Sequence, residues 1–117
     1  MCDLHRDYDL LLTPQLAVAA FAAGHEVPPG SARKRWWEWS PFTYPFNLSQ
    51  QPAATVPCGF TSAGLPVAMQ LVGNKFEDLK VLQASRAFEQ AHPFAMPRLS
   101  QAHAAQAIPS AHTRALR

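Results

Sequence analysis

The stretch AATVPCGFTSAGLPVAMQLVG, residues 53–73, decides the fold. Residues 53–58 and 67–73 are short apolar runs bounded by Pro or Gly, a pattern typical of buried strands. Between them, Thr61-Ser62-Ala63-Gly64 has the composition of a turn. Because the connection is too long for a two-residue turn, the stretch predicts a β-hairpin with a longer loop.

The segment after the hairpin predicts a helix over residues 77–91. Glu77 and Asp78 lie at its start, where the helix dipole favours acidic side chains, and Pro93 ends it. An apolar stripe with helical spacing runs along one face, and Leu82 widens it. The other members of the stripe are Val81, Ala84, Phe88 and Ala91. We interpret this stripe as core packing.

The chain before the hairpin is less regular. An apolar run at residues 8–12 is stopped by Thr13-Pro14 and predicts a short buried strand. The alanine-rich residues 15–23 predict a helix that Gly24 ends. Residues 25–51 form a long irregular segment, and its many aromatic residues argue against plain disorder.

The end of the chain differs in composition from the rest. Residues 96–117 are rich in Ala, Gln, His and Ser and show little periodicity, so we expect a mobile tail after a folded part at residues 1–95. The expected order of strand, irregular segment, hairpin and helix is α/β material. Two or three strands and one long helix leave exposed sheet edges, so we expect a piece of a larger architecture.

Composition excludes several classes of protein. Charged residues are 15% of the 117 residues and the net charge is +2, which supports neither a nucleic-acid partner nor a membrane surface. The basic cluster Arg33-Lys34-Arg35 is therefore interpreted as a solvated loop. No apolar run is long enough to span a bilayer, and no signal-peptide pattern is present. These features favour a cytoplasmic setting.

The cysteines and histidines carry no recognisable site. Cys2 and Cys58 form no disulfide framework. Cys2 and His5 could begin a zinc site, but the other histidines lack paired spacing, so we predict no metal and no cofactor. Cys58 is interpreted as a small buried side chain at a strand end, because cysteine is among the most buried residue types.

Several ordered blocks resemble the C-terminal part of the amidase signature family. They are NLSQQPAATVPCGF at residues 47–60 and GLPVAMQLVG at residues 64–73, followed by the helix. YDLLLTP at residues 8–14 resembles the family's strand that ends in Thr-Pro, and WSPFT at residues 39–43 resembles its aromatic segment. The resemblance covers about residues 7–95. It implies an α/β/α fold around a mixed sheet, of which this chain supplies a hairpin and one long C-terminal helix.

The resemblance also implies a function. Family members hydrolyse a carboxamide with a serine nucleophile, a second serine in a cis peptide and a lysine, and a glycine-serine-rich stretch supplies the oxyanion donors. This sequence has no such stretch, its serines and its three lysines lie in other contexts, and the family's catalytic residues precede the matched region. We therefore assign no catalytic residue and predict that the chain alone is inactive. A small-molecule amide is its substrate only if the missing N-terminal part completes it.

A second hypothesis comes from a different class of protein. The chain could be a non-catalytic interaction module that complements a separately encoded partner chain through an exposed sheet edge. A module of this kind should unfold cooperatively in isolation, whereas an orphaned fragment should aggregate or stay disordered.

Three residues are substrate-pocket candidates: Trp39, Phe42 and Asn47. The resemblance implies that the aromatic segment lies near the acyl pocket, and the alternative for Trp39 and Phe42 is packing under a long loop. The alternative for Asn47 is that it satisfies loop backbone groups.

Three further positions are informative. Gln70, on a strand flanked by apolar residues, is expected to be a buried amide with hydrogen-bond partners. Gln50 and Ala68 stand where the family usually has glycine, and at Gln50 a tight turn would impose a positive φ on a bulky residue.

Overall fold

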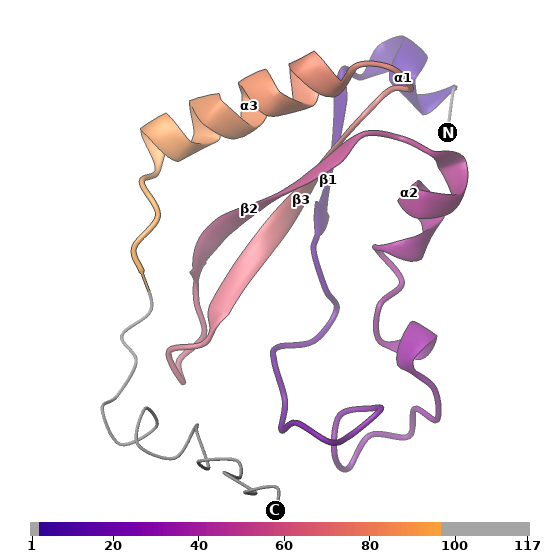
Figure 1. Cartoon of the computed structure of the whole chain (residues 1–117), viewed down its shortest axis with the longest axis vertical. Coiled ribbons are helices and arrows are strands. Elements are labelled where there is room, and N and C mark those ends of the chain that lie inside the picture. Colours follow the sequence, from indigo (N-terminus) through magenta and orange to yellow (C-terminus); the bar gives the residue numbers. More distant parts are fainter. Residues whose placement is uncertain (1–2, 97–117) are drawn as a thin grey trace, which may run out of the picture.

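The computed structural model describes residues 3–96 as a small sheet with helices around it. In chain order the elements are α1 (Leu4–Asp7), β1 (Leu10–Pro14), the 3-10 turn η1 (Trp36–Glu38), α2 (Tyr44–Ser49), β2 (Ala53–Phe60), β3 (Pro66–Gly73) and α3 (Asp78–Ala91). Figure 1 shows α3 crossing above the hairpin, whereas the long segment between β1 and α2 extends away at the opposite end of the strands.

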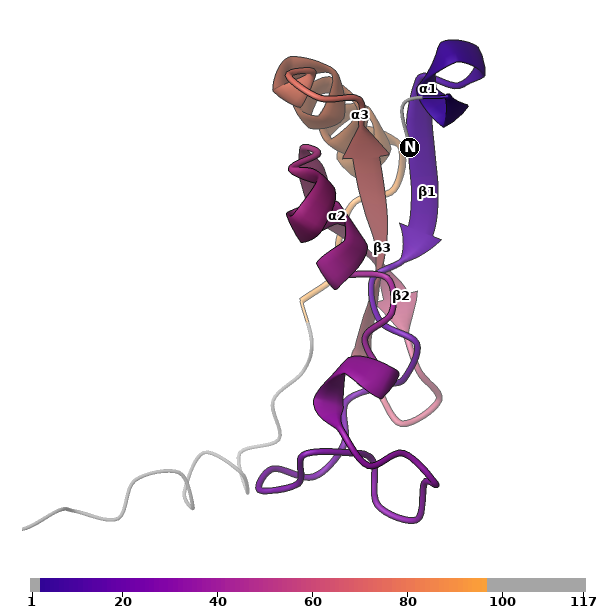
Figure 2. The ribbon, with the colours of Figure 1, turned by 90° about the vertical axis from the view of Figure 1, so that its right-hand side faces the viewer.

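The sheet has three strands in the order β1-β3-β2, and both pairings are antiparallel. The hairpin of β2 and β3 confirms the prediction, and its loop is closed by the Thr61 N–H, which donates to the Leu65 carbonyl at 2.8 Å. Each outer strand has one strand neighbour among the described residues. Figure 2 shows β1 at one side of the sheet.

The main core lies between α3 and one face of the hairpin. Val81 of α3 packs with Val56 of β2 and Leu71 of β3, and partly buried side chains surround these three. The expected helix is confirmed, with its start at Asp78. Leu82 does not join the core as expected, because it is 62% exposed. It lies toward the outer edge of β2, where the described part of the chain has no further strand to pack beneath it.

The predicted helix over residues 15–23 is wrong. The structure gives these residues no helix, and Gly24 follows at φ +85°. After Gln15, the eight residues 16–23 are all apolar or small, and a helix without a polar face needs burial on all sides to be stable. Isolated helices this short are also marginal in water. Here the Gln15 N–H instead donates to the Ala68 carbonyl at 3.1 Å, which extends the β1–β3 pairing by one residue.

Strand β1 is displaced by two residues from the predicted range. It covers Leu10–Pro14 instead of residues 8–12. Hydrogen bonding alternates along an antiparallel pair, so the bond from Gln15 to Ala68 turns the backbone of Pro14 toward the free edge. A proline at that position loses no ladder hydrogen bond, which explains how the strand includes it.

Cys58 is exposed, so its expected burial is wrong. The register of β2 shifts between Pro57 and Gly59, and Cys58 is the extra residue of this irregularity. Its Sγ lies 3.7 Å from the Val67 carbonyl oxygen. Because the residue has no cross-strand partner in the register, its side chain is not carried into the core.

Some expectations concern residues outside the described range. The expected tail covers residues 96–117, of which residues 97–117 lie outside the described range, and so does the cysteine at position 2. Within residues 3–96, no helix is long and apolar enough to cross a membrane.

Candidate functional site

A buried amide joins the sheet to the long irregular segment. Gln70 is 4% exposed, and its Nε2 donates to the Thr13 Oγ1 at 3.2 Å and to the Phe42 carbonyl at 2.8 Å. The expected satisfied amide is therefore confirmed. These contacts bring together the end of β1, the middle of β3 and the residues just before α2.

A second set of hydrogen bonds holds the other end of the same segment. The Thr55 Oγ1 donates to the Gln15 Oε1 at 2.6 Å, and the Thr43 Oγ1 donates to the Gln15 carbonyl at 3.4 Å. Gln15 begins the segment and Thr43 ends it. Residues 15–43 are thus fixed at both ends next to the three strands.

Glu26 organises the interior of the segment. The Trp39 Nε1–H donates to the Glu26 carbonyl at 2.8 Å, and the Trp39 ring packs edge-on against Phe21 with centroids 5.3 Å apart. The Glu26 carboxylate lies 3.7 Å from the Arg35 guanidinium. The guanidinium also lies 5.3 Å from the Trp37 ring centroid.

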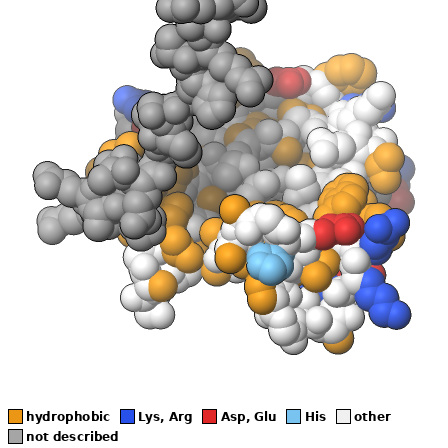
Figure 3. Space-filling view, turned by 60° about the horizontal axis from the view of Figure 1, so that its bottom comes forward, with side chains coloured by type: hydrophobic (Ala, Val, Ile, Leu, Met, Phe, Trp, Pro, Cys, Tyr) orange, Lys and Arg blue, Asp and Glu red, His pale blue; other side chains and the backbone are white. Residues whose placement is uncertain are grey.

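Within the basic cluster, Arg35 forms the ion pair with Glu26, and its two neighbours form hydrogen bonds with Glu38. The Arg33 Nε–H donates to the Glu38 carbonyl and the Lys34 N–H donates to the Glu38 Oε2. On the face that Figure 3 shows, acidic and basic side chains at the right lie next to one another among hydrophobic ones. Lys34 and Arg35 are exposed and Arg33 is half-buried, which supports the interpretation of residues 33–35 as a solvated loop.

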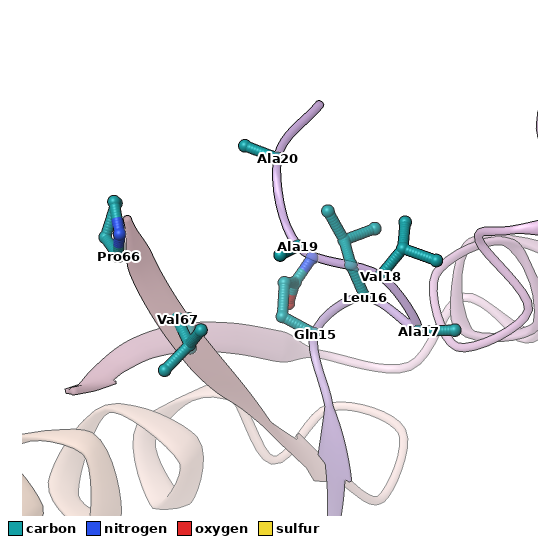
Figure 4. Close-up of a pocket in the computed structure, with 9 residues that line it drawn as sticks. Gln15, Leu16, Ala17, Val18, Ala19, Ala20, Pro66 and Val67 are labelled. Atoms are coloured by element: carbon teal, nitrogen blue, oxygen red, sulfur yellow. The ribbon is translucent and has the colours of Figure 1, made fainter. Parts of the chain in front are cut away.

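An apolar cavity of about 320 Å³ lies between the start of the segment and the hairpin. Residues 15–20 form one wall and residues 66–68 form the other, and Gln15 is the one polar side chain in this lining. Figure 4 shows both walls, with Pro66 and Val67 on their strand and Leu16, Val18 and Ala19 on the opposite chain. The cavity can receive an apolar group of a ligand. The sequence did not reveal this wall, because its alanines predicted a helix.

The three sequence-derived candidates lie on the segment and on α2. Trp39 is half-buried and tied to Glu26, Phe42 is half-buried and its carbonyl is tied to Gln70, and Asn47 is exposed on α2. None of the three lines this cavity. Phe42 is connected to the cavity indirectly. Gln70 binds the Phe42 carbonyl, and the next residue, Thr43, binds the carbonyl of Gln15 in the cavity wall.

A second cavity lies on the other side of the hairpin. Its volume is about 370 Å³, and it runs between β2 and α3 from Thr55 and Pro57 to His92 and Phe94. Phe94 stacks on Phe60 with centroids 6.2 Å apart. Among residues 3–96, no group of three or more His, Cys, Asp or Glu side chains is placed to hold a metal ion.

Ion pairs join the start of β1 to the start of α3. The Lys80 Nζ lies 2.9 Å from the Asp9 Oδ1 and 3.1 Å from the Glu77 Oε1. The hydrogen bond from Lys80, aided by its charge, lowers the pKa of Asp9. The bonds to Asp9 and Glu77 raise the pKa of Lys80. These groups line neither cavity, so their role is structural.

Comparison with known proteins assigns the family. The sequence model of the family described as Amidase matches residues 1–82. The chain belongs to the amidase family. It is 40% identical over 93 residues to an acylamidase of Rhodococcus erythropolis, and this match covers 76% of this chain and 19% of the relative. It is also 40% identical over 86 residues to a subunit of the glutamyl-tRNA(Gln) amidotransferase of Myxococcus xanthus, covering 74% and 17%.

Solved structures of amidase-family proteins have the same fold. The corresponding subunit of the glutamyl-tRNA(Gln) amidotransferase from Thermotoga maritima superposes with a TM-score of 0.70 at 34% identity, covering 85% of this chain and 22% of that one. A bacterial aryl acylamidase of the amidase signature family gives 0.64 at 36% identity, covering 80% and 20%. These matches confirm the predicted family and the α/β fold class. The amidase-family chain spans about one-fifth of the length of the relatives it matches.

Proposed function

We propose that this amidase-family chain forms the C-terminal part of a hydrolase that cleaves the carbon–nitrogen bond of a carboxamide. The observation that carries the proposal is the match of fold and sequence over most of the chain to an acylamidase and to an aryl acylamidase. The family of the chain thus supplies the reaction class, and the apolar cavity beside residues 15–20 supplies a surface on which a substrate group could rest.

We further propose that the chain alone does not hydrolyse amides. Amide hydrolysis needs an activated nucleophile and preorganised donors for the oxyanion. The glycine-serine-rich run that would carry both in this family does not occur in the 117 residues. Activity therefore requires the other four-fifths of an amidase, which a truncated relative can supply as a complementing chain in an assay.

The proposed substrate pocket combines two kinds of wall. Trp39, Phe42 and Asn47 are its aromatic and polar candidates, and the apolar cavity wall at residues 15–20 lies at the other end of the same segment. Since the cavity lining is almost entirely aliphatic, we propose that it receives an apolar portion of the amide. No cofactor enters this reaction.

Complementation tests the proposal. The purified 117-residue chain is mixed with the Rhodococcus erythropolis acylamidase truncated before the matched region, and 4-nitroacetanilide hydrolysis is followed by release of 4-nitroaniline. We expect no turnover from either piece alone and turnover from the mixture. The control is a mixture that contains the chain with the whole 53–73 hairpin deleted. Turnover by the chain alone would contradict its proposed inactivity. Absence of turnover in the mixture would count against the proposed reaction.

The runner-up function is a non-catalytic module that binds a separately encoded chain. The described part exposes many large apolar side chains, more than the surface of a monomer ordinarily carries. Examples are Leu12, Leu48 and Phe76. The Myxococcus xanthus relative is itself one subunit of an amidotransferase, so that relative works within an assembly. Cooperative unfolding of the isolated chain and stoichiometric binding to the truncated acylamidase without turnover would favour the module.

A further inference from the structure

The hydrogen bonds of Gln70 close the base of the long segment. A glutamine amide has two N–H donors, and both the Thr13 hydroxyl and the Phe42 carbonyl accept from its Nε2. The side chain is buried, so water cannot replace a lost partner without cost. Gln70 therefore holds the residues just before α2 against the central strand.

The two contacts of Gln70 differ in what they require. The Thr13 hydroxyl can donate as well as accept, so it tolerates an acceptor at position 70. The Phe42 carbonyl only accepts, so it requires a donor from the sheet. The contact at 2.8 Å to the Phe42 carbonyl is the one that specifies an amide at this position.

The opposite end of the segment is attached within the same group of contacts. Gln15 accepts from Thr55 of β2 and, through its carbonyl, from Thr43, which directly follows Phe42. A shift of the Phe42 backbone would therefore be passed to Gln15 and to the cavity wall that begins there.

We propose that Gln70 is a positioning residue that sets the place of both substrate-pocket walls, the aromatic segment at residues 39–42 and the apolar wall at residues 15–20. The walls' role as a substrate pocket rests on the proposed function. The positioning itself is a property of this chain, and it can be measured without any turnover.

Gln70→Glu in the full chain tests the donor requirement. At about pH 7.5 the carboxylate places a negative oxygen against the Phe42 carbonyl, whereas at about pH 5 the buried carboxyl is protonated and its O–H can donate again. Hydrogen exchange of the Gln15 and Thr43 backbone amides, followed by NMR, reports the two ends of the segment. The Gly73 amide, which donates to the carbonyl of Pro52 just before β2, is the internal reference.

At about pH 7.5 we expect the Gln15 and Thr43 amides to exchange roughly tenfold faster than in the wild type, with Gly73 unchanged. At about pH 5 the ratio to the wild type should return to near one. Gln83→Glu, at an exposed position of α3, makes the same charge change away from the cluster and should alter neither amide. Thr13→Val should have a smaller effect, because the Phe42 contact remains.

Three results would overturn the positioning role: an unchanged Gln15 amide in Gln70→Glu, an equal effect in Gln83→Glu, or no recovery at the lower pH. The complemented enzyme adds a kinetic test, in which Gln70→Glu should raise KM for 4-nitroacetanilide about tenfold with kcat changed less than about threefold. An unchanged KM in Gln70→Glu would show that the segment at residues 15–43 does not form part of the substrate pocket. If the wild-type mixture is inactive, the proposed function fails and the exchange result still decides the positioning role.

Discussion

At the end of α2, one glutamine adopts a conformation that suits glycine. Gln50 has φ +56° and ψ +38°, and its N–H caps the helix by donating to the Asn47 carbonyl at 3.3 Å. The left-handed conformation costs an L-residue with a Cβ roughly 1 kcal/mol, which glycine avoids. Gln50→Gly should therefore raise the free energy of unfolding by about 0.5–1 kcal/mol, measured as a higher urea midpoint at constant m-value.

The matched control for this change is a glutamine in a right-handed helix. Gln83 is exposed in the middle of α3, so Gln83→Gly should lower the free energy of unfolding by about 1 kcal/mol. If both substitutions destabilise the chain alike, strain at Gln50 is absent.

Single residues were predicted correctly where local chemistry constrains them. The turn before the hairpin required a positive φ, and Gln50 has one. The amide on a buried strand required partners, and Gln70 has two. Cys58 failed because its exposure depends on a register irregularity in β2, which arises from pairing with β3 and leaves no mark in the local pattern.

At the scale of elements, α3 packs on β3 through a glycine. A Cβ built on Gly73 would lie 2.7 Å from the Val81 Cγ2, which is too close for both to remain in place. Gly73→Ala should cost about 1–3 kcal/mol of unfolding free energy through this overlap. Val81→Ala alone should cost about 2 kcal/mol through lost burial.

The double variant separates overlap from ordinary loss of packing. Removing the Val81 methyl groups makes room for the new Cβ, so Gly73→Ala with Val81→Ala should cost clearly less than the sum of the two single changes. Urea unfolding of the four proteins measures the coupling. If the two changes in unfolding free energy simply add, α3 moves away from β3 at little cost when a Cβ is introduced at Gly73.

Lys80 links α3 to β1 in a way that depends on pH. The pKa of Asp9 is lowered in the folded chain, so its contribution is present above the unfolded carboxyl pKa and is lost as the pH falls through the lowered value. The pKa of Lys80 is raised, so its contribution is present below the unfolded ammonium pKa and is lost as the pH rises through the raised value. The ion pair therefore stabilises the fold most at pH values between the pKa of Asp9 and the pKa of Lys80.

The measurement is the urea midpoint of the wild type and of Lys80→Met across this pH range. The difference in urea midpoint between the two proteins should be small, because Asp9 is exposed. It should shrink at both the low and the high end of the pH range, and it should fall with added salt. Lys75→Met, at an exposed position in the loop just before α3, is the control and should give a difference that does not vary with pH. A pH-independent difference for Lys80→Met would assign its effect to packing of the methylene groups.

The success of prediction at this scale follows from how each element is stabilised. The hairpin and α3 have local signals, turn residues and an apolar stripe, that agree with their packing. Residues 15–23 have strong helix formers, but their first residue, Gln15, is held in an extended pairing by Ala68, Thr55 and Thr43, far along the chain. The apolar cavity wall was missed for this reason.

At the scale of the whole molecule, the described surface carries large apolar side chains without partners of their own size. Phe76 is 90% exposed and also has φ +68°, a conformation rare for an aromatic residue. The positive φ of Phe76 strains the backbone, and its exposed ring gains almost no burial within the described chain that would offset this strain. On the function proposed above, in which the remaining part of an amidase completes this chain, we infer that this part covers the Phe76 side chain.

Phe76→Asn tests this inference because folding and docking should respond in opposite directions. Asparagine tolerates the left-handed region, so the isolated chain should be as stable as the wild type or more stable by up to about 1 kcal/mol in urea unfolding. Binding to the truncated acylamidase, measured by calorimetry, should weaken by roughly thirtyfold or more, because loss of a buried aromatic anchor costs about 2 kcal/mol or above. Met96→Asn removes another exposed apolar side chain, 77% exposed, at the end of the described chain and should leave binding unchanged. Equal weakening by both would indicate nonspecific apolar association, whereas unchanged binding in Phe76→Asn would place the contact with the rest of the enzyme on another face, such as the free edge of β1.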